Sequence, residues 1–158
     1  MTTPVQHAIR KAVSTDLADI QNIAQDAYSM YLPRMDKKPF PMLEDYGELI
    51  SKGLVYVLHH EHGGIIGFIV LVALPQQSEM LLDNVAVRTD CKGKGFGRIL
   101  LNFAEELAKK NKLVRLVLYT NQAMTENQTL YPHLGFVESH RACEKGYQRI
   151  YYYKNLHA

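Results

Sequence analysis

A glycine-rich stretch between an apolar strand pattern and an amphipathic helix pattern constrains this chain more than any other feature. Residues 92–98 read Lys-Gly-Lys-Gly-Phe-Gly-Arg. Alternate glycines let the backbone pass close to a ligand and turn its N–H groups inward. The helix that follows adds free N–H groups and a dipole that favours phosphate. With the positive charges of Lys92, Lys94 and Arg98, this stretch predicts a site for a pyrophosphate or another polyphosphate.

Two common nucleotide-binding fingerprints do not fit these residues. A Walker loop needs Gly-Lys-Ser/Thr after a four-residue gap, and the stretch has none. The dinucleotide fingerprint Gly-x-Gly-x-x-Gly fails from Gly93, because Arg98 takes the place of the third glycine, and from Gly95, because Leu100 does. The sequence therefore excludes both a Walker-type nucleotide site and a Rossmann-type dinucleotide site.

The patterns along the rest of the chain predict one domain over residues 1–158, with no internal repeat and no linker. Strands are predicted over 7–13, 54–59, 65–74, 79–88, 114–119, 136–140 and 147–153. Helices are predicted from a cap at Ser14 or Thr15 to before Pro33, over 43–52, from 96 onward and over 126–134. This order implies a mixed α/β sheet, with antiparallel pairing early and a βαβ crossover in the middle.

The strand predicted over 79–88 changes the parity of its apolar positions. Met80 and Leu82 are apolar at even numbers, whereas Val85 and Val87 are apolar at odd ones. One extra residue, a β-bulge near Asp83–Asn84, would produce this change.

Composition narrows the classes of partner. The 158 residues carry 18 Lys+Arg against 16 Asp+Glu, a net charge of +2, which predicts neither a nucleic-acid nor a membrane partner. The start of the chain lacks a signal-peptide pattern, and the longest apolar run, 65–74, is too short to span a membrane. We therefore expect a cytoplasmic protein. Neither the two cysteines nor the histidines of the predicted hairpin turn (His59, His60 and His62) predict a metal site.

Together these features resemble the GNAT superfamily of N-acetyltransferases. The family signature Arg/Gln-x-x-Gly-x-Gly/Ala reads here Lys-Gly-Lys-Gly-Phe-Gly from Lys92, with lysine where arginine or glutamine is usual. A second family element, Asn…Tyr-x-x-x-Gly-Phe, matches Asn127, Tyr131 and the pair Gly135–Phe136. The resemblance spans nearly the whole chain. It implies a GNAT-like single domain with a central mixed sheet of about seven strands, splayed in the middle and flanked by about four helices.

The resemblance also implies acetyl-CoA as co-substrate and no metal. In the family, the glycine signature binds the coenzyme A pyrophosphate and the preceding strand pairs with the pantetheine arm. The asparagine contacts the cofactor, and the tyrosine stands near the thiol. The cofactor-binding residues expected here are Val85, Ala86, Val87, Lys92, Gly93, Lys94, Gly95, Phe96, Gly97, Arg98, Asn127 and Tyr131.

Family members pass acetyl directly from the thioester to an amine. An alkyl amine has a pKa of about 10 and must lose a proton before it attacks, so a carboxylate is expected as the base. Glu79 and Asp83 share one strand face, and Glu79 is preferred because a bulge would leave the direction of Asp83 open. Tyr131 is the expected proton donor to the leaving thiolate, and the backbone N–H of Val85 is expected to stabilise the oxyanion.

The acceptor is expected to be a small-molecule primary amine. In the family, the end of the first helix and the loop after it often border the acceptor pocket. The corresponding residues here are Tyr28, Tyr31, Arg34 and Met35. Packing in the core explains the two tyrosines equally well. A noncatalytic acyl-CoA-binding regulatory module and a protein or peptide acetyltransferase are the alternatives. The protein could also form a homodimer, because many members of the family are dimers.

Overall fold

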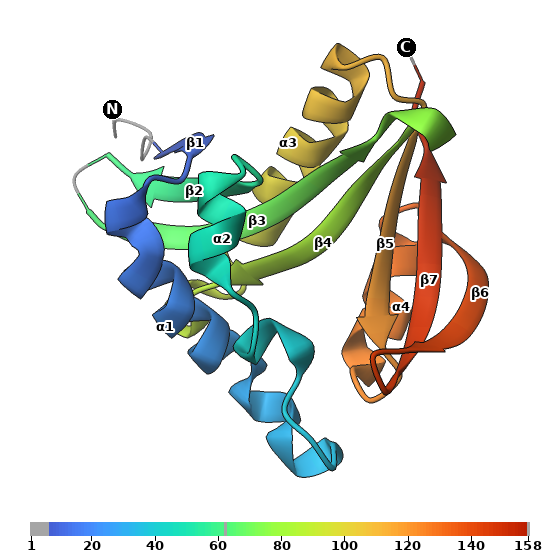
Figure 1. The fold of residues 1–158 in the computed structure, drawn as a ribbon, viewed down its shortest axis with the longest axis horizontal. Helices are drawn as coiled ribbons and strands as arrows, with labels where there is room; N and C mark the ends of the chain where they lie inside the picture. Colours follow the sequence, from blue (N-terminus) through green and yellow to red (C-terminus); the bar gives the residue numbers. More distant parts are fainter. Residues whose placement is uncertain (1–6, 62, 158) are drawn as a thin grey trace.

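A seven-stranded mixed sheet runs through the molecule in the order β1-β2-β3-β4-β5-β7-β6 (Figure 1). The computed structural model describes residues 7–61 and 63–157, so His62 of the predicted hairpin turn lies outside the described residues. The strands are β1 His7–Lys11, β2 Val55–His60, β3 Ile65–Leu74, β4 Glu79–Val87, β5 Arg115–Asn121, β6 Val137–Glu144 and β7 Tyr147–Asn155. Strands β4 and β5 pair in parallel, and the other neighbours are antiparallel.

Four α-helices and several short 3-10 turns flank this sheet. The helices are α1 Leu17–Tyr28, α2 Tyr46–Ser51, α3 Phe96–Lys110 and α4 Thr125–His133. Among the turns, η2 Ser29–Arg34 continues the chain after α1, and η3 Phe40–Met42 precedes α2. The predicted fold class and element order are confirmed. No helix of residues 7–61 and 63–157 has the length and apolarity that a membrane crossing needs.

The start of α1 differs from the sequence prediction. Neither Ser14 nor Thr15 caps the helix, because these residues form a 3-10 turn with Asp16 and α1 begins only at Leu17. The Asp16 carboxylate instead accepts a hydrogen bond from the Val13 N–H at 2.8 Å and binds the Arg10 guanidinium at 2.8 and 3.0 Å. These contacts hold the pKa of Asp16 below its usual value and tie β1 to α1.

Strand β3 is buried on both faces, as its apolar sequence predicts. Helices α1 and α2 cover one face of the sheet, and α3 and α4 cover the other (Figure 1). Phe68 and Val70 pack on the α1 side, whereas Ile69 and Leu71 pack on the α3 side. Gly67 allows close approach here, because a Cβ atom at this position would lie 2.6 Å from the Ala86 carbonyl oxygen.

The predicted bulge in β4 is confirmed, and its extra residue is Asp83. In the β3–β4 pairing, Val70 lies opposite Asn84 and Leu71 lies opposite Leu82, so Asp83 has no partner of its own. The bulge shifts the parity of the strand. Met80, Leu82, Val85 and Val87 therefore all pack on the α3 side.

The two central strands part after a short contact. Pairing of β4 with β5 covers only Glu79–Leu82 and Arg115–Leu118, and beyond this point the strands diverge (Figure 1). From Asp83 onward β4 has β3 alone as its neighbour, while Tyr119 and the end of β5 pair only with β7. The splayed sheet implied by the resemblance is thus present, and it begins at the bulge.

Candidate active site

A cavity of about 350 Å³ lies between the diverging ends of β4 and β5. The end of α1, the turns η2 and η3, the glycine-rich loop, the start of α4 and strand β7 complete its wall. Most residues predicted for the site line this cavity. They are Tyr28, Tyr31, Asp83, Val85, Ala86, Val87, Lys92, Gly93, Gly95, Phe96, Gly97, Asn127 and Tyr131.

Five predicted residues lie elsewhere. Glu79 begins β4, four residues before the bulge, and pairs with Arg115 at 3.6 Å. Arg34 and Met35 border a separate hollow. The side chains of Lys94 and Arg98 are exposed on the glycine-rich loop, outside the cavity lining.

The glycine-rich loop presents an open backbone surface to the cavity. Gly93 and Gly95 have φ angles of +78° and +85°, which favour glycine. Apart from the adjoining residues and the backbone of α3, no atom of the described residues lies within 4 Å of a Cβ built on Gly93, Gly95 or Gly97. The first backbone bond of α3 runs from the Ile99 N–H to the Gly95 carbonyl at 3.2 Å, so the amides of residues 96–98 have no acceptor within the helix. This loop can hold an anion such as a phosphate.

Strand β4 offers unpaired backbone groups along the same cavity. The Arg88 N–H donates to the Ile66 carbonyl at 2.8 Å, toward β3. Because alternate residues of an antiparallel strand direct their amide groups to opposite sides, Ala86 also faces β3, whereas Val85 and Val87 face the side from which β5 has departed. Two backbone positions can therefore pair with an extended ligand.

A buried hydrogen-bond network fixes the bulge. The Asn84 side-chain amide donates to the Tyr46 hydroxyl at 2.7 Å, and that hydroxyl donates to the Pro41 carbonyl at 2.6 Å. The Tyr28 hydroxyl donates to Asn84 Oδ1 and, at 3.1 Å, to the Val85 carbonyl. Burial raises the pKa of both Tyr28 and Tyr46 well above the ordinary value, so both phenols keep their protons. The network holds β4, α1 and the turn before α2 together.

Asp83, the bulge residue, directs a carboxylate into the cavity. Its Oδ1 accepts a hydrogen bond from the Tyr119 hydroxyl at 2.6 Å, while Oδ2 makes no hydrogen bond to the described residues. Burial, and then the charge of Asp83, raise the pKa of Glu44, which itself does not line the cavity. Tyr119 and Glu44 are not predicted as site residues. The position of Tyr119 at the carboxyl end of a parallel strand is a signal that could have found it.

Tyr131 lies on α4 with its ring between Phe136 and Tyr152, at centroid distances of 5.9 and 5.8 Å. Burial raises the pKa of the Tyr131 phenol well above the ordinary value, so the hydroxyl is protonated at neutral pH. Asn127, one helical turn earlier, donates from its amide to the Thr120 hydroxyl at 3.0 Å. The second sequence motif thus brings both of its polar side chains to the cavity wall.

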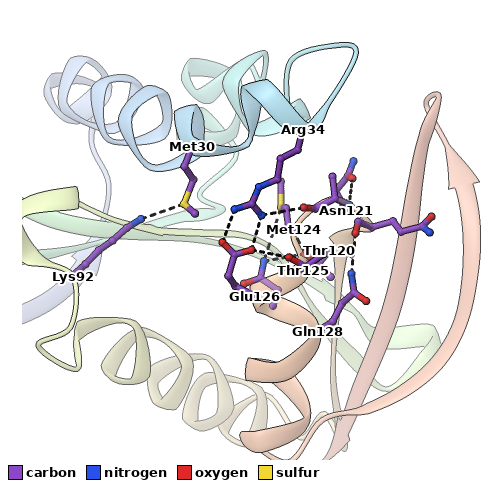
Figure 2. Close-up of polar contacts among 12 residues, drawn as sticks. Met30, Arg34, Lys92, Thr120, Asn121, Met124, Thr125, Glu126 and Gln128 are labelled. Atoms are coloured by element: carbon purple, nitrogen blue, oxygen red, sulfur yellow. Dashed lines mark hydrogen bonds and ion pairs between the residues drawn. The ribbon is translucent and has the colours of Figure 1, made fainter.

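An ion pair joins the two sides of the molecule beside the cavity. The Arg34 guanidinium binds both carboxylate oxygens of Glu126 at 2.6 and 2.9 Å and donates to the Ala123 carbonyl at 3.2 Å (Figure 2). The hydrogen bonds from Arg34 lower the pKa of Glu126 to about 2. Figure 2 also shows Lys92 of the glycine-rich loop directed at the Met30 sulfur, 3.8 Å away. These contacts link η2 to α4 and to the glycine-rich loop.

The far end of the cavity is aromatic and contains a buried cation that sequence reasoning missed. Phe40, Tyr119 and Tyr147 line this end around the guanidinium of Arg149. Arg149 is the charged residue in a run of tyrosines that the sequence analysis does not use, and its β7 position places it on the same sheet face as Tyr147. In the described part of the chain, no group of three or more His, Cys, Asp or Glu side chains is arranged to hold a metal ion.

Comparisons with known proteins agree with this geometry. A family model described as an acetyltransferase (GNAT) domain matches residues 51–138, more than half of the chain. A comparison with curated proteins gave no significant match.

Solved structures of similar fold cover almost the whole chain. The PaiA N-acetyltransferase of Thermoplasma acidophilum in complex with coenzyme A is 18% identical with a TM-score of 0.78, covering 95% of this chain and 99% of that one. The ribosomal-protein-S18-alanine N-acetyltransferase of Escherichia coli is 20% identical with a TM-score of 0.74, covering 97% and 96%. The IAA acetyltransferase of Bacillus cereus is 22% identical with a TM-score of 0.67, covering 96% and 100%. The chain therefore belongs to the GNAT acetyltransferase family.

Proposed function

We propose that this protein is an acetyl-CoA-dependent N-acetyltransferase that transfers acetyl directly to a small primary amine. GNAT acetyltransferases use acetyl-CoA as their acetyl donor. The observation that carries the proposal is the meeting of a carboxylate, Asp83, and a protonated phenol, Tyr131, in one cavity with the glycine-rich loop.

The residues of the cavity fit coenzyme A. The open backbone of Gly93 and Gly95 and the amides of residues 96–98 would hold the diphosphate. The backbone groups of Val87 would pair with the pantetheine arm, which leaves the Val85 N–H for the reacting carbonyl, and Asn127 would contact the cofactor. When bound, acetyl-CoA supplies the thioester carbonyl that the amine attacks and the thiolate that leaves.

We assign the general base to Asp83 rather than to Glu79. Asp83 lines the cavity, whereas Glu79 pairs with Arg115 outside it. The Tyr119 hydroxyl orients the Asp83 carboxylate through Oδ1 and leaves Oδ2 to accept the proton that the attacking amine nitrogen loses, directly or through one water molecule.

Tyr131 is assigned as the general acid. Its hydroxyl holds a proton at neutral pH, as an ordinary phenol with a pKa of about 10 already does, and it can give that proton to the leaving sulfur. The Tyr28 hydroxyl binds the Val85 carbonyl and so helps to hold this residue, and the Val85 N–H, which faces the cavity, can donate to the developing oxyanion.

The walls of the cavity favour a small acceptor over a peptide. Tyr28, Tyr31 and Phe40 line it on the side of α1, η2 and η3, and the Arg34–Glu126 pair spans the gap to α4. An extended peptide would need an open groove on this side.

The test is thiol release from acetyl-CoA with a panel of primary amines, comparing Asp83→Asn with Glu79→Gln. Loss of the base should lower kcat/KM of Asp83→Asn by about 100-fold or more, with coenzyme A affinity unchanged by calorimetry. Glu79→Gln and the exposed control Asp90→Asn should keep wild-type rates. The reverse result would return the base to Glu79. Coenzyme A binding with no turnover of any amine would instead support a noncatalytic binding module.

A further inference from the structure

Arg149 is a buried cation that the proposed reaction does not use. Its side chain is only 6% exposed and lines the end of the cavity formed by β5, β7 and η3. A buried charge destabilises a fold unless it is paired and hydrogen-bonded. The contacts of Arg149 therefore show how many of its N–H donors have an acceptor.

The guanidinium of Arg149 has few polar partners. Its one ion pair in the described chain is to Glu144 at 3.4 Å, and that carboxylate is half exposed. By contrast, the more exposed guanidinium groups of Arg10 and Arg34 each bind a carboxylate through two hydrogen bonds of 2.6–3.0 Å. Arginine has five N–H donors. Arg149 thus keeps unused donors inside a cavity.

Aromatic rings surround this cation. Its Cζ lies 4.1 Å from the centroid of Tyr119 and 6.0 Å from those of Phe40 and Tyr147. The Tyr151 hydroxyl, buried on the same side of β7, interacts with Glu144 and Arg149 but makes no hydrogen bond of good geometry among the described residues. Rings stabilise the positive charge from their faces but accept no strong hydrogen bonds, so the in-plane donors remain available to a ligand.

Tyr119 links this cation to the assigned base. Its hydroxyl donates to Asp83 at 2.6 Å, while the guanidinium of Arg149 lies over the face of its ring. A carboxylate and a guanidinium therefore lie about one tyrosine side chain apart in the same cavity. Lys37 and Lys145 add positive charge at the rim beside Arg149, with their ammonium groups 4.0 and 4.2 Å from the centroids of Tyr147 and Phe40.

We infer that the acceptor is a small amino acid, an amine that also carries a carboxylate, and that Arg149 binds the carboxylate while Asp83 takes the proton of the amine. The planar guanidinium fork matches a carboxylate with two parallel hydrogen bonds. Such a ligand would supply the acceptors that Arg149 lacks. This inference rests on the proposed function, because it names the substrate class of the same site.

The first test needs only the wild-type protein. Thiol release from acetyl-CoA is measured with each standard primary-amine amino acid, with β-alanine and with 4-aminobutyrate, each against its own carboxamide. The carboxamide keeps the size, removes the negative charge and lowers the pKa of the amine, so kcat/KM is compared per unprotonated amine. On that scale we expect at least one amino acid to exceed its carboxamide at least tenfold. Preference for the carboxamides across the panel would overturn the inference.

The second test uses Arg149→Gln, with Arg141→Gln as a matched control. Arg141 lies on β6, pairs with Glu138 and is exposed outside the cavity. The ratio of kcat/KM between the best amino acid and its carboxamide should fall to near one in Arg149→Gln and stay at the wild-type value in Arg141→Gln. An unchanged ratio in Arg149→Gln would overturn the role of Arg149.

Calorimetry supplies a readout other than turnover. The same amino acid, titrated into protein saturated with coenzyme A, should release heat with the wild type and at least tenfold weaker binding with Arg149→Gln. Titration of coenzyme A itself shows whether the variant is folded, and if it is not, the wild-type ratio alone decides. Failure of the proposed function looks different, because then neither amino acids nor carboxamides release thiol although coenzyme A binds.

Discussion

At the scale of single residues, packing fixes the position of Tyr131. Its ring is held by Phe136 and Tyr152, and the same burial raises the pKa of its hydroxyl. The phenol is protonated at neutral pH, as an ordinary tyrosine is. We therefore expect its hydroxyl to act as a proton donor to the leaving thiolate and to add little to coenzyme A affinity.

Tyr131→Phe should lower kcat by about 100-fold, within the range typical of general acid catalysis, while coenzyme A affinity changes less than twofold. The substitution removes one oxygen and keeps the ring, so packing is preserved. Tyr152→Phe is the matched control, because Tyr152 belongs to the same aromatic cluster but does not line the cavity. An unchanged kcat in Tyr131→Phe would remove this hydroxyl from the mechanism.

Residues of this site differ in how far the sequence could predict them. Tyr131 follows from a motif, whereas strand position left Glu79 and Asp83 as alternatives and favoured Glu79. The end of a parallel strand is a signal for Tyr119, but Arg149 could not be predicted, because it meets Tyr119 only through the β5–β7 register, in which Tyr119 lies opposite Tyr151 and Asn121 opposite Arg149. Long-range pairing of this kind leaves no local signal.

At the scale of elements, the two edges of strand β4 have different roles. One edge bonds to β3, and the other faces the cavity from Asp83 onward. The bulge was predictable because a change in apolar parity is local to the strand. The start of α1 was not, because the ion pair of Asp16 with Arg10 depends on where β1 lies next to the helix. Local patterns thus predict elements, and contacts between elements decide their ends.

Amide exchange measured by NMR can test the assignment of the two edges. Saturating coenzyme A should slow exchange of the Val85 or Val87 amide at least tenfold, because these groups face the cavity and would bond to the ligand. The Arg88 amide already donates to the Ile66 carbonyl, so its rate should change less than twofold. Equal protection at all three amides would point to general tightening of the fold and would contradict pairing of the ligand with one edge.

At the scale of the whole molecule, one cavity forms because a continuous sheet opens in its middle. The core on the α1 side is confined to the half that contains β3 and β4, whereas the core on the α3 side also takes in Leu116 and Leu118 of β5 and Ile150 of β7. Strands β4 and β5 themselves pair through only four residue pairs. The Arg34–Glu126 ion pair bridges the open end beside the cavity, but it is exposed, and exposed pairs contribute little to stability. A ligand that fills the opening should therefore stabilise the entire domain.

Coenzyme A at about 100 times its Kd should stabilise the fold by about 2.7 kcal/mol. In a domain of this size that corresponds to a rise in Tm of about 5–10 °C by differential scanning calorimetry. Gly95→Ala should lose about half of this shift at the same concentration. An alanine at a φ of +85° costs about 1–2 kcal/mol, which raises Kd roughly tenfold if binding requires that loop conformation. Gly64→Ala is the control, because Gly64 lies in the β2–β3 turn with nothing within 4 Å of an added Cβ, and it should keep the full shift. A full shift in Gly95→Ala would mean that the diphosphate is bound elsewhere than on the glycine-rich loop.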